Sequence, residues 1–199
     1  MTKILYISSS VTGENSFSLP LGKAIVEKLQ LANPDNTLVE HNLISNPLPH
    51  ITETHLIAFA TTAGQRPPEL QEAARLSDDA IAELMEADVV VIGAPLYNFG
   101  IPSALKAWID HIARAGLIFH YTEHGPEGLV KGKKVYLAIA TGGVYSEGPM
   151  LAYDFVTPYL KAVLGFIGMT DITVFRAEGT AIPGLKEAAL EKAIAGIRL

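Results

Sequence analysis

The sequence predicts an α/β fold, a doubly wound parallel sheet of five strands with helices on both faces. The first observation is that five strand-like runs alternate along the 199 residues with five segments of helical periodicity, the order expected of strands joined by crossover helices. The second is that the first, third and fourth runs are nearly continuous in apolar residues, as is typical of parallel strands covered on both faces. The chain shows no internal repeat, low-complexity tract or linker, so we expect a single domain over residues 1–199.

The predicted strands are short and lie between the helical segments. They span residues 3–7, 37–41, 88–94, 134–141 and 171–177. The predicted helices carry apolar residues three and four positions apart, which places those residues on one face. They span residues 18–30, 70–86, 102–114, 157 to 165 or 168, and 185–197.

Three details of this assignment can be checked directly. Trp108 lies on the apolar face of the third predicted helix, so we interpret it as a packing residue rather than a ligand contact. Thr157 followed by Pro158 is typical of an N-cap and the first helical position. The stretches 42–68 and 116–132 show neither the alternation of a strand nor the three-and-four spacing of a helix. They are predicted to be long irregular loops, which usually carry function or an interface.

Composition excludes several classes of function. Hydrophobic residues make up 49% of the chain, yet no apolar run reaches the ~18 residues that a membrane span needs. The formal net charge is −6, which disfavours nucleic acid as a partner because phosphate contacts need a basic face. The absence of cysteine excludes disulfides, thiolate catalysis and Cys-ligated metal. The N-terminus shows no signal-peptide pattern, so we expect a cytoplasmic protein.

The segment 8–18 has the features of an anion site. Three serines (8–10) follow the first apolar run, and Ser16 and Ser18 precede the first helix. Backbone N–H groups and the dipole at a helix N-terminus favour a negative charge there. Residues 4–22 contain no Lys or Arg and no Walker sequence, so the anion would be held by neutral donors, as suits a phosphate monoester. A simple N-cap and turn is the alternative interpretation.

Two further loops should meet this segment, because ligands of such sheets bind outside the carboxyl ends of the strands. After the third strand, Tyr97-Asn98-Phe99 offers a flat aromatic wall and an amide that donates and accepts. After the fourth, Gly142-Gly143 lets a ring edge approach the backbone. Alone, these could be core aromatics and a plain turn. Together they predict a flavin mononucleotide (FMN) site. The absence of GxGxxG argues against NAD as the resident cofactor.

Other polar groups carry weaker signals. His120 and His124 stand four apart, as metal ligands on a helix would, but the surrounding glycines and proline do not support a helix, so we expect no metal site. Lys131, Lys133 and Lys134 are interpreted as a solvated approach to the fourth strand. No Ser/His/Asp arrangement indicates a nucleophilic triad.

Four segments in this order resemble one family over nearly the whole chain. They are SSSVTGENSFS (8–18), GAPLYNFGIPSALKAWIDHIARAGLIFHYTEHGPEGLVKGKK (93–134), ATGGVYSEGP (140–149) and VTPYLKAVLGFIGMTDITVFRAEG (156–179). They are similar to the bacterial FMN-dependent NADH:azoreductases, also described as NADH:quinone reductases. The resemblance implies a flavodoxin-like fold, a homodimer with two FMN sites near its interface, and NADH as electron donor. Quinones or azo compounds would be the acceptors.

The resemblance also implies the residues that contact FMN. The ribityl phosphate would be held by Ser10, Ser16, Phe17 and Ser18; the isoalloxazine ring would be flanked by Leu96, Tyr97, Asn98 and Phe99; its pyrimidine edge would meet Ala140, Thr141, Gly142 and Gly143. Two departures are visible. The family often has Met at position 96, and it often has Ser-Arg at positions 140 and 141. The missing Arg removes a cation near the flavin and could lower its reduction potential or alter its substrate preference.

The chemistry implied is a hydride transfer from NADH to FMN followed by two-electron reduction of the acceptor, with no catalytic side chain of the protein itself. Phe119, Tyr121 and Tyr145 are candidate walls of the acceptor pocket, although packing at an interface is an equal alternative for the first two. Two other classes stay open: a flavodoxin-like electron carrier without its own substrate pocket, and a flavin-free binding module on the same scaffold.

Overall fold

A computed structural model describes residues 2–199 and contains the predicted parallel sheet. Its strands are β1 (Lys3–Ser8), β2 (Thr37–Asn42), β3 (Val89–Pro95), β6 (Lys134–Ala140) and β7 (Asp171–Ala177). They lie in the order β2-β1-β3-β6-β7, and every neighbouring pair is parallel. Strand order therefore reverses beside β1 and β3, which places a ligand crevice at their carboxyl ends.

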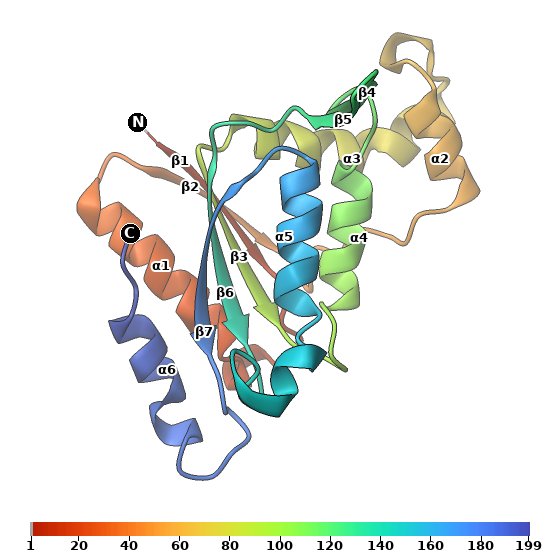
Figure 1. Ribbon diagram of the computed structural model, residues 1–199. Coiled ribbons are helices and arrows are strands. Elements are labelled where there is room, and N and C mark those ends of the chain that lie inside the picture. The colour runs from red at the N-terminus through yellow and green to blue at the C-terminus, as the bar shows by residue number, and fades with distance from the viewer. Residues whose placement is uncertain (1) are drawn as a thin grey trace.

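Helices cover both faces of the sheet, as predicted (Figure 1). One face carries α1 (Ser18–Ala32) and α6 (Lys186–Ala195), and the other carries α3 (Pro68–Glu86), α4 (Ser103–Ile112) and α5 (Val156–Phe166). Each layer has its own apolar core against the sheet. Trp108 is 1% exposed in the core beneath α4, which confirms that it is a packing residue. Across residues 2–199, no helix combines the length and the apolar character needed to cross a membrane.

The two stretches predicted to be irregular both contain regular structure. Helix α2 (Glu53–Ala60) lies within the first, and the hairpin of β4 (Phe119–Thr122) and β5 (Gly125–Gly128) lies within the second. The prediction was wrong because long-range contacts order these short elements. A Cβ on Gly128 would lie 2.2 Å from the backbone N of Gly168, so the hairpin packs backbone against backbone on the end of α5. Three short 3₁₀ turns complete the fold: η1 (Gly13–Asn15), η2 (Ala63–Gln65) and η3 (Gly148–Tyr153).

Two smaller predictions were also wrong. Helix α5 begins at Val156, one residue before the proposed cap Thr157, and the carboxylate of Asp154 accepts the N–H groups of both residues. Lys133 is not solvated but 9% exposed. Its ammonium donates to the carbonyls of Met85 and Ala87 at the end of α3, where cations complement the helix dipole. Burial lowers the pKa of Lys133.

A buried tyrosine sets the start of α1 against the sheet. The hydroxyl of Tyr6, on β1, donates to the carbonyl of Leu19 in the first turn of α1, at 3.0 Å. Its ring lies against Gly22, where a Cβ would approach the tyrosine oxygen to 2.5 Å, so only glycine fits. Burial raises the pKa of Tyr6 and keeps its hydroxyl a donor. This contact fixes the N-terminus of α1 next to the loop that follows β1.

Candidate functional site

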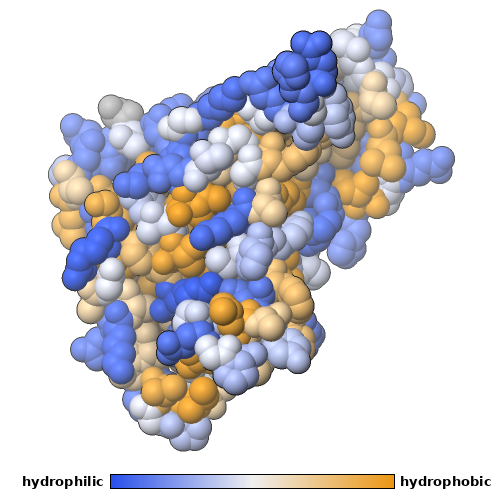
Figure 2. Space-filling view, viewed as in Figure 1, coloured by the Kyte–Doolittle hydropathy of each residue, from blue (hydrophilic) through white to orange (hydrophobic). Residues whose placement is uncertain are grey.

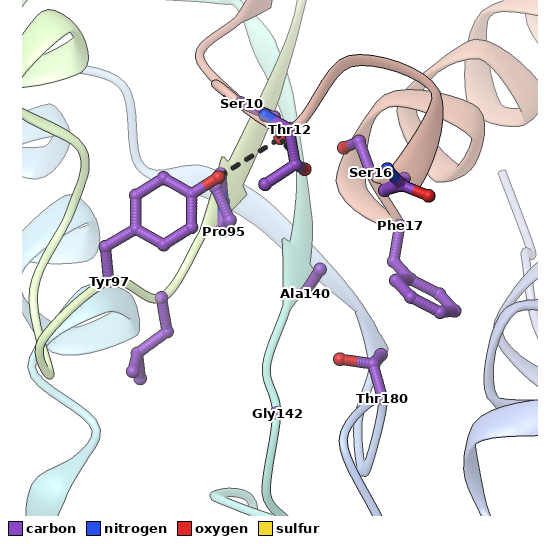
Figure 3. Close-up of a pocket in the computed structure, with 11 residues that line it drawn as sticks. Ser10, Thr12, Ser16, Phe17, Pro95, Tyr97, Ala140, Gly142 and Thr180 are labelled. Carbon is purple, nitrogen blue, oxygen red and sulfur yellow. Dashed lines mark hydrogen bonds between the residues drawn. The ribbon is translucent and has the colours of Figure 1, made fainter.

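A pocket of about 180 Å³ lies at the carboxyl ends of β1, β3 and β6 (Figure 3). Its lining residues are Ser10, Thr12, Asn15, Ser16, Phe17, Pro95, Leu96, Tyr97, Ala140, Gly142 and Thr180. The loops after the first, third and fourth predicted strands therefore converge, as predicted from the sequence. None of these lining residues, all within the described part of the chain, is charged.

One wall of the pocket is the start of α1. The hydroxyl oxygen of Ser16 accepts the N–H of Leu19 at 3.1 Å and lies 3.3 Å from that of Ser18. Pro20 has no N–H. Within residues 2–199, the N–H groups of Phe17 and Ser18 have no protein acceptor. These two donors and the helix dipole suit an anion bound without a counter-cation. Of the two serines, Ser16 lines the pocket, whereas the Ser18 side chain is fully buried.

The second wall joins the loops after β1 and β3. The phenol oxygen of Tyr97 lies 3.3 Å from the hydroxyl of Ser10 and accepts the N–H of Val11 at 3.3 Å. The hydroxyl of Ser10 also lies 3.0 Å from that of Thr12. Figure 3 shows the Tyr97 ring pointing across the pocket mouth toward these hydroxyls. Tyr97 therefore holds the loop after β1 in place and contributes one aromatic side of the pocket.

The turn beyond Tyr97 is strained. Tyr97 and Gly100 exchange both backbone hydrogen bonds at 3.0 Å, around a two-residue turn. Its central residues have positive φ, 49° at Asn98 and 69° at Phe99. Such angles suit Asn and Gly but are costly for an aromatic residue, and strain of this kind concentrates at ligand sites. The turn leaves Phe99 43% exposed beside the pocket, so its ring is available to a ligand.

The third wall is the loop after β6. The hydroxyl of Thr141 donates to the carbonyl of Gly143 at 2.8 Å, and its side chain is turned inward, with 1% exposure. Thr180, just beyond β7, donates to the carbonyl of Thr141 at 3.1 Å. In the described residues the N–H groups of Gly142 and Gly143 have no protein acceptor, so they are free for the edge of a planar ring. The loop offers backbone donors and no cation.

Charged residues lie behind this loop and hold it. The carboxylate of Glu178 accepts the N–H groups of Tyr145 and Ser146 at 2.8 and 2.9 Å. Arg176, on β7, binds Asp154 at 2.7 Å and lies 3.8 Å from Glu178. Burial alone would raise the pKa of Asp154, but hydrogen bonds from Thr157 and Arg176 outweigh it and leave this pKa below its usual value. The position of the loop is thus set from the end of β7.

The structure brings most of the predicted contact residues together. Seven of them line the pocket: Ser10, Ser16, Phe17, Leu96, Tyr97, Ala140 and Gly142. Ser18, Asn98, Phe99, Thr141 and Gly143 lie in the same loops behind or beside it. Sequence reasoning missed Thr12, Asn15, Pro95 and Thr180. Thr180 could have been found, since it follows a fifth strand whose carboxyl end lies at the same edge of the sheet.

The three residues predicted to line the acceptor pocket lie in two different parts of the structure. Tyr145 is 8% exposed, and its ring lies against Gly143, where a Cβ would approach it to 3.2 Å. Phe119 and Tyr121 belong to the hairpin β4–β5, at the opposite end of the sheet from the pocket (Figure 1). Phe119 is 8% exposed and packs on Phe166, with ring centroids 4.7 Å apart. Neither hairpin residue reaches the pocket of its own chain.

The two histidines considered as metal ligands lie on the same hairpin. His120 is 3.4 Å from Glu127, and His124 is 3.5 Å from Glu123. No cluster of three or more metal-ligating side chains occurs within residues 2–199.

Comparison with known proteins finds relatives that match nearly the whole of this chain. A family model described as flavodoxin-like fold matches residues 2–198. The chain is 53% identical over 182 residues to the FMN-dependent NADH:quinone oxidoreductase of Herminiimonas arsenicoxydans, covering 92% of this chain and 89% of the relative. It is 46% identical over 195 residues to that of Mesorhizobium japonicum, covering 98% and 93%.

A solved structure agrees in fold and in sequence. The FMN-dependent NADH-azoreductase from Bacillus anthracis, crystallised in complex with FMN, superimposes with a TM-score of 0.87 at 31% sequence identity. The match covers 98% of this chain and 95% of that one.

Proposed function

Because the chain belongs to the family with a flavodoxin-like fold, matched over residues 2–198, we propose that it is an FMN-dependent NADH:quinone oxidoreductase that also reduces azo compounds. The observation that carries this proposal is the pocket at the strand ends. It combines free backbone donors at the start of α1, an aromatic turn, and a glycine loop with free N–H groups. These three walls match, in turn, the phosphate, the planar ring and the polar ring edge of FMN. The homologous quinone oxidoreductases and the FMN complex of the azoreductase support the same cofactor.

The residues present fit FMN without a cation. Ser16 and the N–H groups of Phe17 and Ser18 would hold the phosphate, Tyr97 with the turn after it would flank the ring, and the N–H groups of Gly142 and Gly143 would meet its polar edge. When bound, FMN supplies hydride acceptance from NADH and two-electron reduction of a quinone or azo compound, and azo cleavage to two amines takes two such cycles. The protein binds, orients and partly desolvates the reactants.

Steady-state kinetics test this function against an electron carrier. The FMN-loaded protein should oxidise NADH continuously in the presence of 1,4-benzoquinone, with one quinone consumed per NADH. A carrier would pass electrons only when supplied with a separate reductase. A purified protein that takes up no FMN would instead favour a flavin-free binding module. The homologues' names support the enzyme over both alternatives.

We further propose a homodimer. The apolar residues of segment 116–132 would favour a partner surface if they were exposed together, but Ile118 and Phe119 are buried within the chain. Leu117 and Tyr121 are still exposed, as are Leu56 and Ile57 on α2. Figure 2 shows hydrophobic side chains gathered over α2 on this face. Exposed apolar side chains of this number support a partner surface.

A dimer would also give the hairpin residues a role. Tyr121 cannot reach the pocket of its own chain, so it could serve an acceptor only in the site of a second copy. Light scattering at micromolar protein should give twice the chain mass of 21.3 kDa; a mass equal to one chain would refute the dimer.

We also propose a cytoplasmic location, because NADH as donor is available there.

A further inference from the structure

The segment after the glycine loop exposes an unusual number of apolar side chains. It comprises η3 (Gly148–Tyr153) and Phe155, which precedes α5. Leu151, Tyr153 and Phe155 are 54%, 48% and 56% exposed, and Met150 is 36% exposed. Apolar side chains gathered on one short surface segment usually mark a binding surface.

This segment lies beside the mouth of the candidate cofactor pocket. It continues directly from the loop after β6, at the carboxyl end of the sheet (Figure 1). The ring centroids of Tyr153 and Phe99 are 5.5 Å apart, with an interplanar angle of 39°. Phe99 belongs to the strained turn next to Tyr97, which lines the pocket. The two half-exposed rings therefore form one aromatic surface that adjoins the pocket.

Both ends of the segment are anchored by charged groups. At its start, Glu178 binds the N–H groups of Tyr145 and Ser146. At its end, Asp154 binds Arg176 and accepts the first N–H groups of α5. The apolar side chains lie between these two anchors. Since both anchors are attached at the end of β7, the segment is positioned by the fold and its exposed rings have a fixed place.

We propose that η3 is the outer wall of the acceptor site, and that Tyr153 with Phe99 selects flat acceptors of two or more fused rings over single-ring quinones. This inference rests on the proposed function, since it places the acceptor beside bound FMN. A single-ring quinone beside the flavin offers no further ring for contact with this surface. A naphthoquinone or anthraquinone carries one or two additional fused rings, which would lie on the aromatic surface of Phe99 and Tyr153. Aromatic contacts of this kind favour the larger acceptor.

The test uses the FMN-loaded full-length protein and the variants Tyr153→Ser and Tyr153→Phe. Leu31→Ser, at an 80% exposed apolar residue on α1, is the matched control for loss of a surface apolar group. Binding of anthraquinone-2-sulfonate is measured by calorimetry without NADH. The kcat/KM values for menadione and 1,4-benzoquinone are measured with NADH, and the FMN affinity by fluorescence titration.

Tyr153→Ser should raise the Kd of anthraquinone-2-sulfonate about tenfold and lower kcat/KM for menadione similarly. The value for 1,4-benzoquinone and the FMN affinity should stay within twofold of the original protein. Tyr153→Phe should keep the original Kd, because it keeps the ring, and so should Leu31→Ser.

Three results would overturn the inference. An unchanged Kd in Tyr153→Ser would show that the acceptor does not touch η3. Loss of FMN affinity in parallel would show a purely structural role. A change in molecular mass with unchanged acceptor binding would show that a second copy of the chain covers this surface. If the original protein itself bound no FMN and oxidised no NADH, the proposed function would fail, a result distinct from these three.

Discussion

At the residue scale, neutral hydrogen-bond donors carry the proposed anion site. The Ser16 hydroxyl accepts the Leu19 N–H, so its own proton can be donated either to the Ser18 hydroxyl, 3.3 Å away, or to a ligand. Ser18 has an adjacent hydroxyl but is fully buried. The sequence could predict both serines from their place between a strand and a helix. It could not separate their roles, because burial depends on how α1 packs on β1 through Tyr6 and Gly22.

Replacement of Ser16 should therefore affect FMN binding more than replacement of Ser18. A hydrogen bond to a charged group contributes about 1.5–3 kcal/mol, so Ser16→Ala should weaken FMN binding at least tenfold. Ser18→Ala should have a smaller effect, and the double variant should keep its fold. Fluorescence titration of the apoprotein with FMN measures all three. Equal effects of the two single variants would contradict the assignment of Ser16 as the direct partner.

At the element scale, the helices and strands predicted from the sequence agree best with the structure where their order depends on local packing. The five parallel strands and their helices follow from apolar periodicity alone. Helix α2 and the hairpin β4–β5 escaped prediction because their order comes from distant partners. Arg66 fixes α2 by donating to the carbonyl of Ala58 and binding Asp78 on α3, and Gly128 rests on the end of α5. The cap of α5 was misplaced for a similar reason, since Asp154 is held from β7 by Arg176.

The Asp154 cap predicts a measurable pH dependence. Its pKa in the folded protein lies below the unfolded value of about 3.9, so its contribution to stability is present above that value and is lost as pH falls through the folded pKa. Asp154→Asn keeps an oxygen that can cap α5 but removes the charge that binds Arg176, so it should cost about 1.5–3 kcal/mol at pH 7. The difference from the original protein should shrink below about pH 4. Urea unfolding at pH 7 and pH 3.5 measures both, and a constant difference across this range would exclude the charged cap.

At the scale of the whole molecule, one edge of the sheet gathers the entire site. The loops after β1, β3 and β6 meet there, with Thr180 beyond β7. The opposite end of the sheet holds the hairpin β4–β5 and a cluster of three rings, those of His111, His55 and Phe59. His111 is fully buried, its Nε2 lies 2.9 Å from the carbonyl of Pro49, and its ring centroid lies 5.3 Å from that of His55. Sequence could locate the first edge by the strand-end rule. It had no comparable rule for the second.

Buried His111 predicts a second pH effect, on the stability of the whole fold. Burial lowers its pKa below the unfolded value of about 6.5. The unfolded chain therefore binds more protons between these two values, and stability should rise with pH across that window and level off above about pH 6.5. His111→Gln should remove this slope. Urea midpoints at pH 5.5 and pH 7.5 test it, and an undiminished slope in the variant would assign the effect to another group.

A single pocket at the strand ends also constrains the order of events. If NADH and the quinone both need the open face of one flavin, NAD⁺ must leave before the quinone enters. Plots of inverse rate against inverse quinone concentration, at several fixed NADH levels, should then be parallel. Intersecting lines would require a complex holding both reactants and a second binding site outside the loops described above.

The proposed function requires that the three loops at the carboxyl ends of β1, β3 and β6 bind FMN in a form that NADH reduces. The most direct measurement is the visible absorption spectrum of the FMN-loaded, desalted protein under anaerobic conditions, before and after one equivalent of NADH. We expect a flavin band that survives desalting, bleaches on addition of NADH and returns when a quinone is added. A colourless desalted protein, or a retained flavin band that NADH leaves unchanged, would contradict it.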